Sequence, residues 1–397
     1  MLVSTIELFT RARHAKELGI NGTENLTFDW PAVIARKDEI VKTWSVGKNA
    51  TPEKLGVPVL RGHATFSAPH EISVNGKTYS AEKFIIAAGS KPARPPISGA
   101  EYAITSDELI HLEEQPARMV VVGGGFIGLE FGFALAWAGT KVTILQSGAE
   151  IAPALDQEIR AILLESAAKA GIEVKTNVNV TRIGKDKTVE SDIGGRTETF
   201  SADQVLLATG RPSNVAPLNP HAANIELDHS AVKVNEYLQS VSAPHIYAVG
   251  DSAGKRQQSP VAWYEGPIAA HNAIEGNERK VDFSVFPTAI FTIPAVGQVG
   301  LTEAEAHNRG IKAKTTKLPY ENNPAAGVRN ETEGMVKVVY EEGSERILGV
   351  HVIGAHAEDT IQIAAMAMQG GLKKSEVGAM HYVFPTFGGA IFDAMAT

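Results

Sequence analysis

The residues best suited to chemistry form a glycine-rich turn, GGGFIG, at residues 123–128. The turn directly follows an apolar strand-like segment, residues 118–122, and it opens a helix-forming run that leads to a second strand. In this setting Gly123 permits the tight turn, Gly125 lets a pyrophosphate approach the helix N-terminus, and Gly128 lets the helix pack on the strand. This context favours a dinucleotide site over a purely structural turn.

The residue that ends the second strand, residues 141–145, is Gln146. A carboxylate at this place would hold the ribose 2′-hydroxyl of NAD. An amide can bond a hydroxyl but adds no negative charge that would repel a 2′-phosphate, and no Arg or Lys stands beside it. Gln146 is therefore a candidate contact for NAD or NADP, and the choice between the two stays open.

A second candidate turn, Gly250-Asp251, ends the apolar segment 246–249. It offers a carboxylate and backbone N–H groups, which suit the ribityl and phosphate part of a flavin cofactor. Two other apolar segments end in small residues, at 87–89 and at 208–210. Small side chains at a sheet edge let a cofactor lie against the strands. Together with the glycine turn, these features indicate a protein that binds two cofactors.

The composition excludes several classes of protein. The 397 residues include no cysteine, so disulfides, zinc-thiolate sites and thiol nucleophiles are impossible, and no metal site is predicted. A net charge of −8 without a Lys/Arg cluster argues against nucleic acid and anionic membranes as partners. No apolar run is long enough to span a membrane, and the first residues lack a signal peptide's apolar core. A cytoplasmic protein is expected.

The elements that position these turns alternate between strands and helices, which predicts an α/β fold of two or three domains at this length. Pro-rich connectors and changes of pattern divide the chain into three units: 1–98 with 223–280, then 99–222, then 281–397. Asn75-Gly76 predicts a tight hairpin turn. Helices are expected over 4–19, 30–48, 156–170, 261–275 and 357–369.

The ordered set of motifs resembles the pyridine nucleotide-disulfide oxidoreductases, the flavoproteins that include dihydrolipoamide dehydrogenase, glutathione reductase and mercuric reductase. The resemblance covers essentially the whole chain and rests on GHATF (62–66), IIAAG (85–89), GGGFIGLE (123–130), ATGRPSN (208–214), IYAVGD (246–251), EG (265–266), FTIPAVGQVGLTEAEA (291–306) and FPTF (384–387). It implies two Rossmann-like dinucleotide-binding domains, with the FAD domain in two pieces. It also implies a C-terminal α+β dimerisation domain, and therefore a homodimer.

The resemblance also assigns the site residues. It implies NAD(P) contacts from Gly123, Gly125, Phe126, Ile127, Gly128, Gln146 and Gly210. It implies FAD contacts from His63, Ala64, Ala88, Gly89, Gly250, Asp251 and Ala262. Phe126 matches a ring that gates the nicotinamide pocket in the family, although a packed core ring is the alternative. The family counterpart of Glu130 pairs with a lysine beside the flavin. Without that lysine, Glu130 is exposed, re-paired, or shifted to a higher pKa by burial.

The sequence departs from the family at two places. Family members begin with a strand and their own glycine turn for the FAD pyrophosphate, followed by a redox cysteine pair and Pro-Ser-Lys. Met1 to Thr5 matches the start of the helix after that segment, so we expect an incomplete FAD domain and weakened FAD binding, whatever the origin of this N-terminus. The family's catalytic His and its Glu correspond to Phe384 and Gly389. His381 nearby is not expected to replace them.

Disulfide reduction needs thiolates, so it is not expected of this chain. The first hypothesis is an FAD-dependent NAD(P)H oxidoreductase of diaphorase type, with hydride passing to the flavin and on to a small-molecule acceptor such as a quinone, a dye, a metal ion or oxygen. The alternative is a catalytically inactive, dimeric dinucleotide-binding scaffold with impaired or absent FAD binding. A third possibility is a fragment whose folding is compromised. Phe384 and Phe387 are expected to cover the partner subunit's flavin.

Overall fold

The computed structural model describes residues 1–23 and 25–397, and these form two compact units. The first unit joins Met1–Asp38, Arg94–Thr209 and Ser284–Thr397. The second unit joins Glu39–Ala93 and Gly210–Phe283. The three-domain division expected from the sequence, 1–98 with 223–280, 99–222 and 281–397, stays a prediction.

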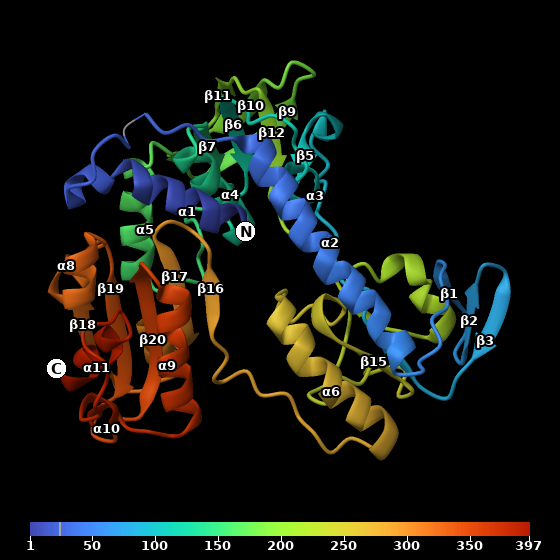
Figure 1. Ribbon diagram of the computed structural model, residues 1–397. Helices are drawn as coiled ribbons and strands as arrows, with labels where there is room; N and C mark the ends of the chain where they lie inside the picture. Colours follow the sequence, from blue (N-terminus) through green and yellow to red (C-terminus); the bar gives the residue numbers. More distant parts are fainter. Residues whose placement is uncertain (24) are drawn as a thin grey trace. The chain divides into compact units, whose positions relative to one another are not determined.

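The first unit contains a five-stranded, all-parallel sheet in the order β5-β12-β6-β7-β8 (Figure 1). Its strands are β5 (Ile104–Thr105), β6 (Arg118–Val122), β7 (Lys141–Leu145), β8 (Glu173–Lys175) and β12 (Gln204–Leu207). The central strands are almost wholly apolar and buried, as expected where helices cover both faces of a parallel sheet. The accompanying helices are α3 (Ser106–Leu109), α4 (Phe126–Trp137) and α5 (Gln157–Lys169).

An antiparallel sheet of three strands follows α5 and β8 in the chain. It has the order β11-β10-β9, with β9 at Val178–Ile183, β10 at Val189–Ile193 and β11 at Arg196–Phe200. Its buried residues share a core with β6 and β12 of the parallel sheet. In this core Val180 of β9 and Val189 of β10 cluster with Val205 of β12. Ahead of this sheet in the chain, β6, the glycine turn, α4 and β7 follow one another, which confirms the strand, turn and helix order expected around the glycine turn.

The N-terminal helix predicted for 4–19 consists of two pieces, α1 (Leu2–Arg13) and the 3₁₀ helix η1 (Ala15–Leu18). Gly19 ends the second piece at φ 84°, a left-handed conformation that glycine adopts without strain. Ile6 of α1 is fully buried in the same core as α4. The next helix, α2 (Trp30–Lys54), extends beyond the predicted residue 48 and crosses the boundary between the two units.

The C-terminal segment of the first unit is a five-stranded antiparallel sheet in the order β16-β17-β20-β19-β18. Its elements are β16 (Thr288–Ile290), β17 (Ala295–Gly300), α7 (Glu303–Asn308), β18 (Ala313–Pro319), α8 (Pro324–Arg329), β19 (Met335–Glu341), β20 (Ile347–Gly354), α9 (Ala357–Gln369), α10 (Lys374–Gly378) and α11 (Gly389–Ala396). Helix α9 covers the sheet closely, because a Cβ on Gly297 would lie 2.5 Å from the carbonyl oxygen of Ala357.

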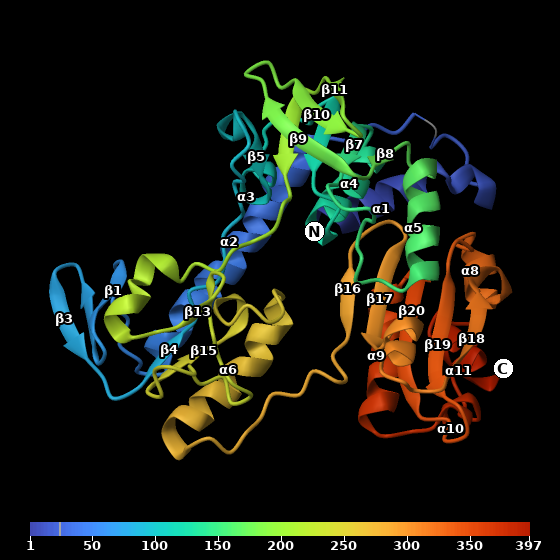
Figure 2. The ribbon, with the colours of Figure 1, turned by 180° about the vertical axis from the view of Figure 1, so that it is seen from behind.

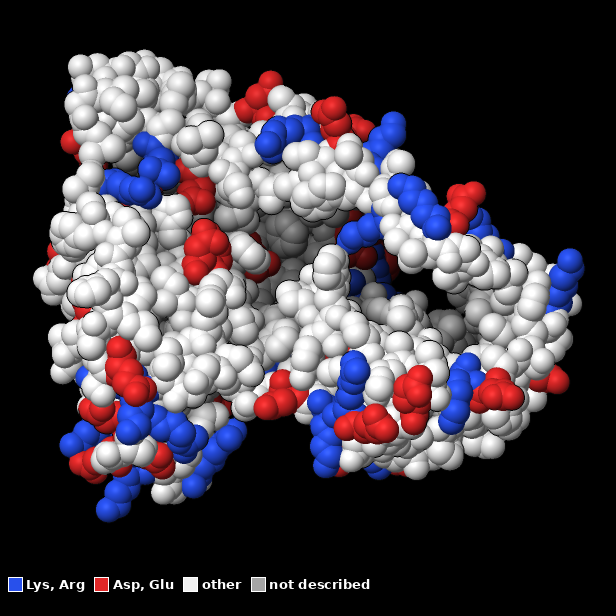
Figure 3. All heavy atoms as spheres, turned by 60° about the horizontal axis from the view of Figure 1, so that its bottom comes forward, with Lys and Arg blue, Asp and Glu red and all other residues white. Residues whose placement is uncertain are grey.

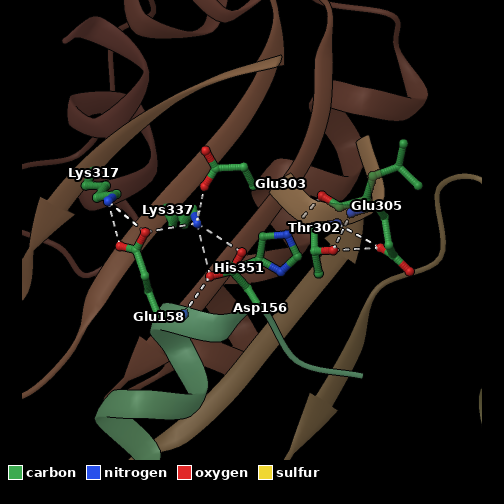
Figure 4. Close-up of polar contacts among 9 residues, drawn as sticks. Asp156, Glu158, Thr302, Glu303, Glu305, Lys317, Lys337 and His351 are labelled. Atoms are coloured by element: carbon green, nitrogen blue, oxygen red, sulfur yellow. Dashed lines mark hydrogen bonds and ion pairs between the residues drawn. The ribbon is translucent and has the colours of Figure 1, made fainter. Parts of the chain in front are cut away.

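Buried charges join α5 to this sheet (Figure 4). Lys337 of β19 is 2% exposed, and its Nζ contacts Asp156 at 3.0 Å, Glu158 at 3.2 Å and Glu303 at 2.8 Å. Asp156 is itself 3% exposed and caps α5 by accepting from the Glu158 N–H at 3.0 Å. We call these four residues the Lys337 cluster. It fixes the start of α5 against β19 within the first unit.

The second unit is built on two parallel strands, β4 (Phe84–Ile86) and β15 (Ile246–Ala248), shown side by side in Figure 2. The other elements are β1 (Ala64–Ala68), β2 (Glu71–Val74), β3 (Lys77–Ser80), β13 (Leu227–Asp228), β14 (Ala231–Val232) and α6 (Ser259–Glu275). The hairpin predicted at Asn75-Gly76 is confirmed: Val74 pairs with Lys77, and both turn residues have positive φ.

The predicted α/β fold class, with Rossmann-like parallel sheets, is confirmed by this arrangement. Within residues 1–23 and 25–397, no helix is long and apolar enough to cross a membrane. On the face drawn in Figure 3, acidic and basic side chains are interspersed rather than gathered by sign.

Candidate functional site

The glycine turn, residues 123–128, lies between the end of β6 and the start of α4. Two of its glycines are required by contact: a Cβ on Gly123 would lie 2.4 Å from the Ala208 carbonyl oxygen, and one on Gly128 would lie 2.0 Å from the Gly123 carbonyl oxygen. Gly125 differs, because it is exposed and a Cβ there would meet no atom within 4 Å. Space for a ligand therefore lies at the N-terminus of α4, and the turn fits a pyrophosphate.

Gln146 is a part of this turn rather than a free side chain beside it. Its Oε1 accepts from the Gly124 N–H at 2.9 Å, and its Nε2 donates to the Glu150 carbonyl oxygen at 3.2 Å. The structure therefore brings Gln146 to the glycine turn as predicted, but with both ends of the amide engaged. The sequence carried no signal for this, because the partners are backbone groups.

Glu130 lies on α4, and its Oε1 accepts from the Phe291 N–H at 3.0 Å. Burial raises the pKa of this carboxyl above its usual value, although the hydrogen bond from Phe291 acts in the opposite direction. Of the outcomes left open by the sequence, re-pairing and burial both hold. Phe126, at the start of the same helix, is half-buried and packs against the main core of the first unit.

The aspartate turn, Gly250-Asp251, follows β15 in the second unit. The Gly250 N–H donates to Oε2 of Glu265 at 2.6 Å, and Gly250 has a φ of 59°. A Cβ on Gly250 would lie 2.9 Å from the Cβ of Ala262, so α6 passes closely over the turn. Ser90 donates to the Asp251 carboxylate. The carboxylate expected to meet a ribityl group thus already has a partner.

Ala88 and Gly89 lie at the same edge as the aspartate turn, since β4 and β15 are parallel and in register. The Gly89 N–H donates to Oγ of Ser252 at 3.1 Å, and a Cβ on Gly89 would meet no atom within 4 Å. Small residues, open space and a carboxylate therefore occur together here. The FAD contacts expected of these residues stay a prediction.

Glu265 was not singled out as a site residue from the sequence, where it appeared only within an EG motif. It is 0% exposed, and its Oε1 has no hydrogen-bond partner among the described residues. Burial is the main cause that raises its pKa, with the nearby Asp251 charge acting in the same direction and the Gly250 N–H and Lys255 acting against it. A buried, half-satisfied carboxyl directly behind the aspartate turn could be found only once α6 was placed.

Three predicted site residues belong neither to the glycine turn nor to the aspartate turn: His63, Ala64 and Gly210. His63 is exposed and Ala64 begins β1, whose sheet packs on β4 through Phe66 and Phe84 with ring centroids 5.3 Å apart. Gly210 begins the second segment of the second unit, and its carbonyl accepts from the Ala93 N–H at 2.9 Å. Their roles in binding FAD and NAD(P) stay predictions.

The expectation that both Phe384 and Phe387 cover a flavin is wrong for Phe387. This ring is 5% exposed and packs inside its own unit, with ring centroids 5.7 Å from Tyr320 and 4.7 Å from His356. Phe384 is 66% exposed, and His381 is exposed as well. Periodicity could not separate the two phenylalanines, because the segment that carries them is irregular.

A cavity of about 390 Å³ opens in the first unit beside α1. Its lining includes Glu7, His14, Trp137 and the loop 291–295. The lining described for it contains none of the predicted cofactor residues, so it is separate from the glycine turn.

Comparison with protein families gives two matches. The model described as pyridine nucleotide-disulphide oxidoreductase matches residues 9–274, and the model of the corresponding dimerisation domain matches residues 286–395. The two matches together cover nearly all of the chain, including both turns.

Curated relatives and solved structures agree with these matches. Mercuric reductase of Staphylococcus aureus is 36% identical over 326 residues, which is 81% of this chain and 59% of the relative, so the chain spans less than two-thirds of that protein. Dihydrolipoyl dehydrogenase of Geobacillus stearothermophilus is 32% identical over 402 residues, 99% of this chain and 85% of the relative. The HOCl-induced flavoprotein disulfide reductase RclA from Escherichia coli superposes with a TM-score of 0.85 at 26% identity, covering 98% of this chain and 89% of that one.

Proposed function

The chain belongs to the pyridine nucleotide-disulphide oxidoreductase family, whose cofactors are FAD and NAD(P)H, and on that premise we propose that it is an NAD(P)H oxidoreductase with a non-disulfide acceptor. When bound, FAD would take hydride from NAD(P)H and deliver electrons to a small molecule such as a quinone, a dye, a metal ion or oxygen. The observation that carries the proposal is the glycine turn with open space at Gly125, in a chain that has no cysteine.

The side chains of this chain support a non-disulfide acceptor. Thiol–disulfide exchange requires a thiolate, and the 397 residues contain none. At the family's acid–base positions this chain has Phe384, which is exposed, and Gly389, which begins α11. Neither side chain can transfer a proton. This chain therefore lacks both the thiolates and the acid–base pair that disulfide reduction uses.

The chain's own residues supply binding and orientation. The turn at Gly123 and Gly125 would hold the dinucleotide phosphates, with Phe126 and Glu130 on the first turns of α4 beside the nicotinamide. Because Glu130 is half-buried and accepts from the Phe291 N–H, its carboxyl is held in one place. We assign these two residues to orientation of the nicotinamide ring, and Asp251 with Gly250 to the flavin side.

A second candidate is a dimeric dinucleotide-binding scaffold that binds FAD poorly or not at all. It is favoured by one observation, the hydrogen bond from Ser90 that already occupies the Asp251 carboxylate. A ligand hydroxyl would compete with Ser90 for this carboxylate, which lowers the net gain from binding.

The assembly and the location belong to the same proposal. The dimerisation domain at residues 286–395 supports a homodimer. We place this homodimer in the cytoplasm, in agreement with the sequence analysis.

The test is a visible absorption spectrum of the purified chain, with and without added FAD, followed by NADH or NADPH under argon. The proposal expects a flavin band that bleaches on addition of a nicotinamide nucleotide and returns when a quinone or dye is added. A colourless protein that gains no flavin band, yet melts at a higher temperature with NAD(P), would establish the scaffold instead. A flavin band that no nucleotide bleaches would exclude both.

A further inference from the structure

Gln146 bonds the protein with both ends of its side-chain amide and with both of its backbone groups. The side chain bonds the Gly124 N–H and the Glu150 carbonyl oxygen, at 2.9 and 3.2 Å. Its backbone N–H donates to Lys175 at 2.8 Å, and its carbonyl accepts from Val178 at 3.0 Å. The Gln146 side chain therefore links the glycine turn to the loop after β7 and stabilises the conformation of the turn.

The surrounding glycines show that the amide has a built place. A Cβ on Gly124 would first meet Cγ2 of Ile151, at 2.8 Å, and would lie 3.4 Å from Oε1 of Gln146, whereas one on Gly148 would lie 3.1 Å from the Nε2 of Gln146. The distance from Gly148 is tighter than a normal contact, so a side chain at residue 148 would push the amide away. The absence of side chains at these two positions lets the amide lie flat across the turn.

The loop after β7 offers little charge with which to tell a hydroxyl from a phosphate. Residues 146–150 are Gln-Ser-Gly-Ala-Glu, so Glu150 is the single charged residue of this stretch. Its carboxylate pairs with Arg160 at 2.7 Å, and the Arg160 side chain is only 11% exposed. Since the Glu150 carboxylate is paired, residues 146–150 offer no unpaired charge beside Gln146, which stands where other dinucleotide folds carry the acidic residue that reads the 2′ position.

We propose that Gln146 is a positioning residue that holds the glycine turn in shape and leaves the adenosine 2′ position unread, so that the chain accepts NAD and NADP with similar affinity. This inference rests on the proposed function, because it requires that the glycine turn bind a nicotinamide dinucleotide. It goes further by assigning the cofactor preference to one side chain. The competing role is direct bonding of the 2′ group by the Gln146 amide, through the Nε2 hydrogen that the Glu150 carbonyl oxygen does not use.

The test measures dissociation constants of NAD⁺ and NADP⁺ by isothermal titration calorimetry on the full chain in 0.15 M salt. For the unchanged chain we expect the two constants to agree within about fivefold, since no unpaired charge discriminates between the ligands. For Gln146→Ala we expect both affinities to fall by the same factor, about five- to tenfold, which corresponds to one turn hydrogen bond.

Two further variants separate shape from charge. Gln146→Glu keeps an acceptor for the Gly124 N–H but adds a negative charge, so NADP⁺ should weaken at least about tenfold more than NAD⁺. Gly148→Ala displaces the amide without touching its chemistry and should weaken both nucleotides equally. The matched control is Gln157→Ala, the same substitution at an exposed position on α5, which should change neither constant. Circular dichroism melting confirms that each variant is folded.

Three outcomes would overturn the inference. The first is a preference of the unchanged chain above about twentyfold for either nucleotide, which is a discrimination that an unread 2′ position cannot give. The second is a Gln146→Ala variant that loses affinity for one nucleotide alone, which would make Gln146 a direct reader. The third is that neither nucleotide binds, which also removes the dinucleotide premise of the proposed function. If both nucleotides bind equally but no flavin band bleaches, the proposed function fails and this inference stands.

Discussion

Two buried charges in this chain are satisfied in opposite ways. In the first unit, Lys337 is 2% exposed and is surrounded by three carboxylates within 3.2 Å. In the second unit, Glu265 is 0% exposed, accepts one backbone N–H, and leaves Oε1 without a hydrogen-bond partner among the described residues. The first arrangement joins α5 to the C-terminal sheet, and the second supports the aspartate turn that is assigned to the flavin.

The difference has an electrostatic consequence. Burial acts to raise the pKa of Asp156 and to lower that of Lys337, but their mutual hydrogen bonds outweigh it, so the pKa of Asp156 is lowered and that of Lys337 is raised. Both groups thus stay ionised over a wide range of pH. Glu265 has no such cation bonded to it, and burial raises its pKa. The buried charges of the Lys337 cluster are therefore paired, whereas the Glu265 carboxyl at the candidate site is left sensitive to pH.

The largest expected effect comes from breaking the paired side of the comparison. Lys337→Met keeps the length of the side chain but leaves the buried Asp156 without its cation, which should lower the free energy of unfolding by about 3–5 kcal/mol. Equilibrium urea unfolding followed by circular dichroism measures this loss. The control is Lys317→Met, which removes an ion pair to Glu158 from a side chain that is 43% exposed. It should cost less than about 1 kcal/mol, and equal losses for the two variants would contradict the role given to the cluster.

The next effect separates the hydrogen bond of Glu265 from its charge. Glu265→Ala leaves the Gly250 N–H without an acceptor and opens a cavity, so we expect a loss of about 2–4 kcal/mol in unfolding free energy. Glu265→Gln retains an acceptor for that N–H and should lose less than about 1 kcal/mol at neutral pH, because it also removes a buried charge. If Gln were as damaging as Ala in urea unfolding, the charge itself would be needed and the comparison would fail.

The third effect is a dependence on pH. Since the folded pKa of Glu265 is raised, its contribution to stability is fully present below its usual value of 4.5 and is lost as pH rises through the folded value. The stability difference between the unchanged chain and Glu265→Gln should therefore shift against the unchanged chain as pH rises from 4.5. The pKa shifts of the Lys337 cluster should add no slope from well above the usual values of 3.8 for Asp156 and 4.5 for Glu158 to well below the usual value of 10.5 for Lys337. Urea unfolding at a series of pH values measures both, and a flat difference for Glu265→Gln would contradict the prediction.

The smallest expected effect concerns Ser90, which engages the carboxylate beside Glu265. Ser90→Ala removes the bond to Asp251 and the one that the Ser90 hydroxyl accepts from Arg211 at 3.0 Å, so it should cost about 1–3 kcal/mol of unfolding free energy, the usual net value of two hydrogen bonds. It frees Asp251 from a competing donor, so FAD affinity measured by flavin fluorescence quenching should rise. Asp251→Asn serves as the opposite control and should lower that affinity. A fall in FAD affinity for Ser90→Ala would show that Ser90 assists the site rather than competing with it.

The sequence predicted features that depend on local geometry. Gly123 and Gly128 could be recognised because a tight turn and close helix packing exclude side chains at fixed spacing. The Asn75-Gly76 hairpin was equally local. In contrast, Lys337 lies within an apolar strand pattern that gives no reason for a buried cation. Its partners come from α5 and α7, and only the packed structure brings them together.

Hydrogen bonds from backbone groups to side chains also could not be predicted from the sequence. The role of Gln146 depends on the N–H of Gly124, and that of Glu265 depends on the N–H of Gly250. Every residue type has such a group, so composition and spacing cannot point to it. Gln146 could be named as a site residue from the pattern, whereas Glu265 appeared only within a motif, and the hydrogen-bond partner of neither could be predicted.

The cap of α5 has a consequence for the exchange of amide hydrogens with solvent. Helix ends normally fray and exchange fastest, and the final turn of α5 is anchored nearer the surface, where Ser166 and Lys169 bond Glu333, a side chain that is 37% exposed. At the other end, Asp156 holds the Glu158 amide by its side chain and the Arg160 amide by its carbonyl oxygen, while its carboxylate neutralises Lys337. Opening the first turn would expose a buried cation. Deuterium should therefore enter α5 from its C-terminal end, the reverse of the order expected for a helix that begins in solvent.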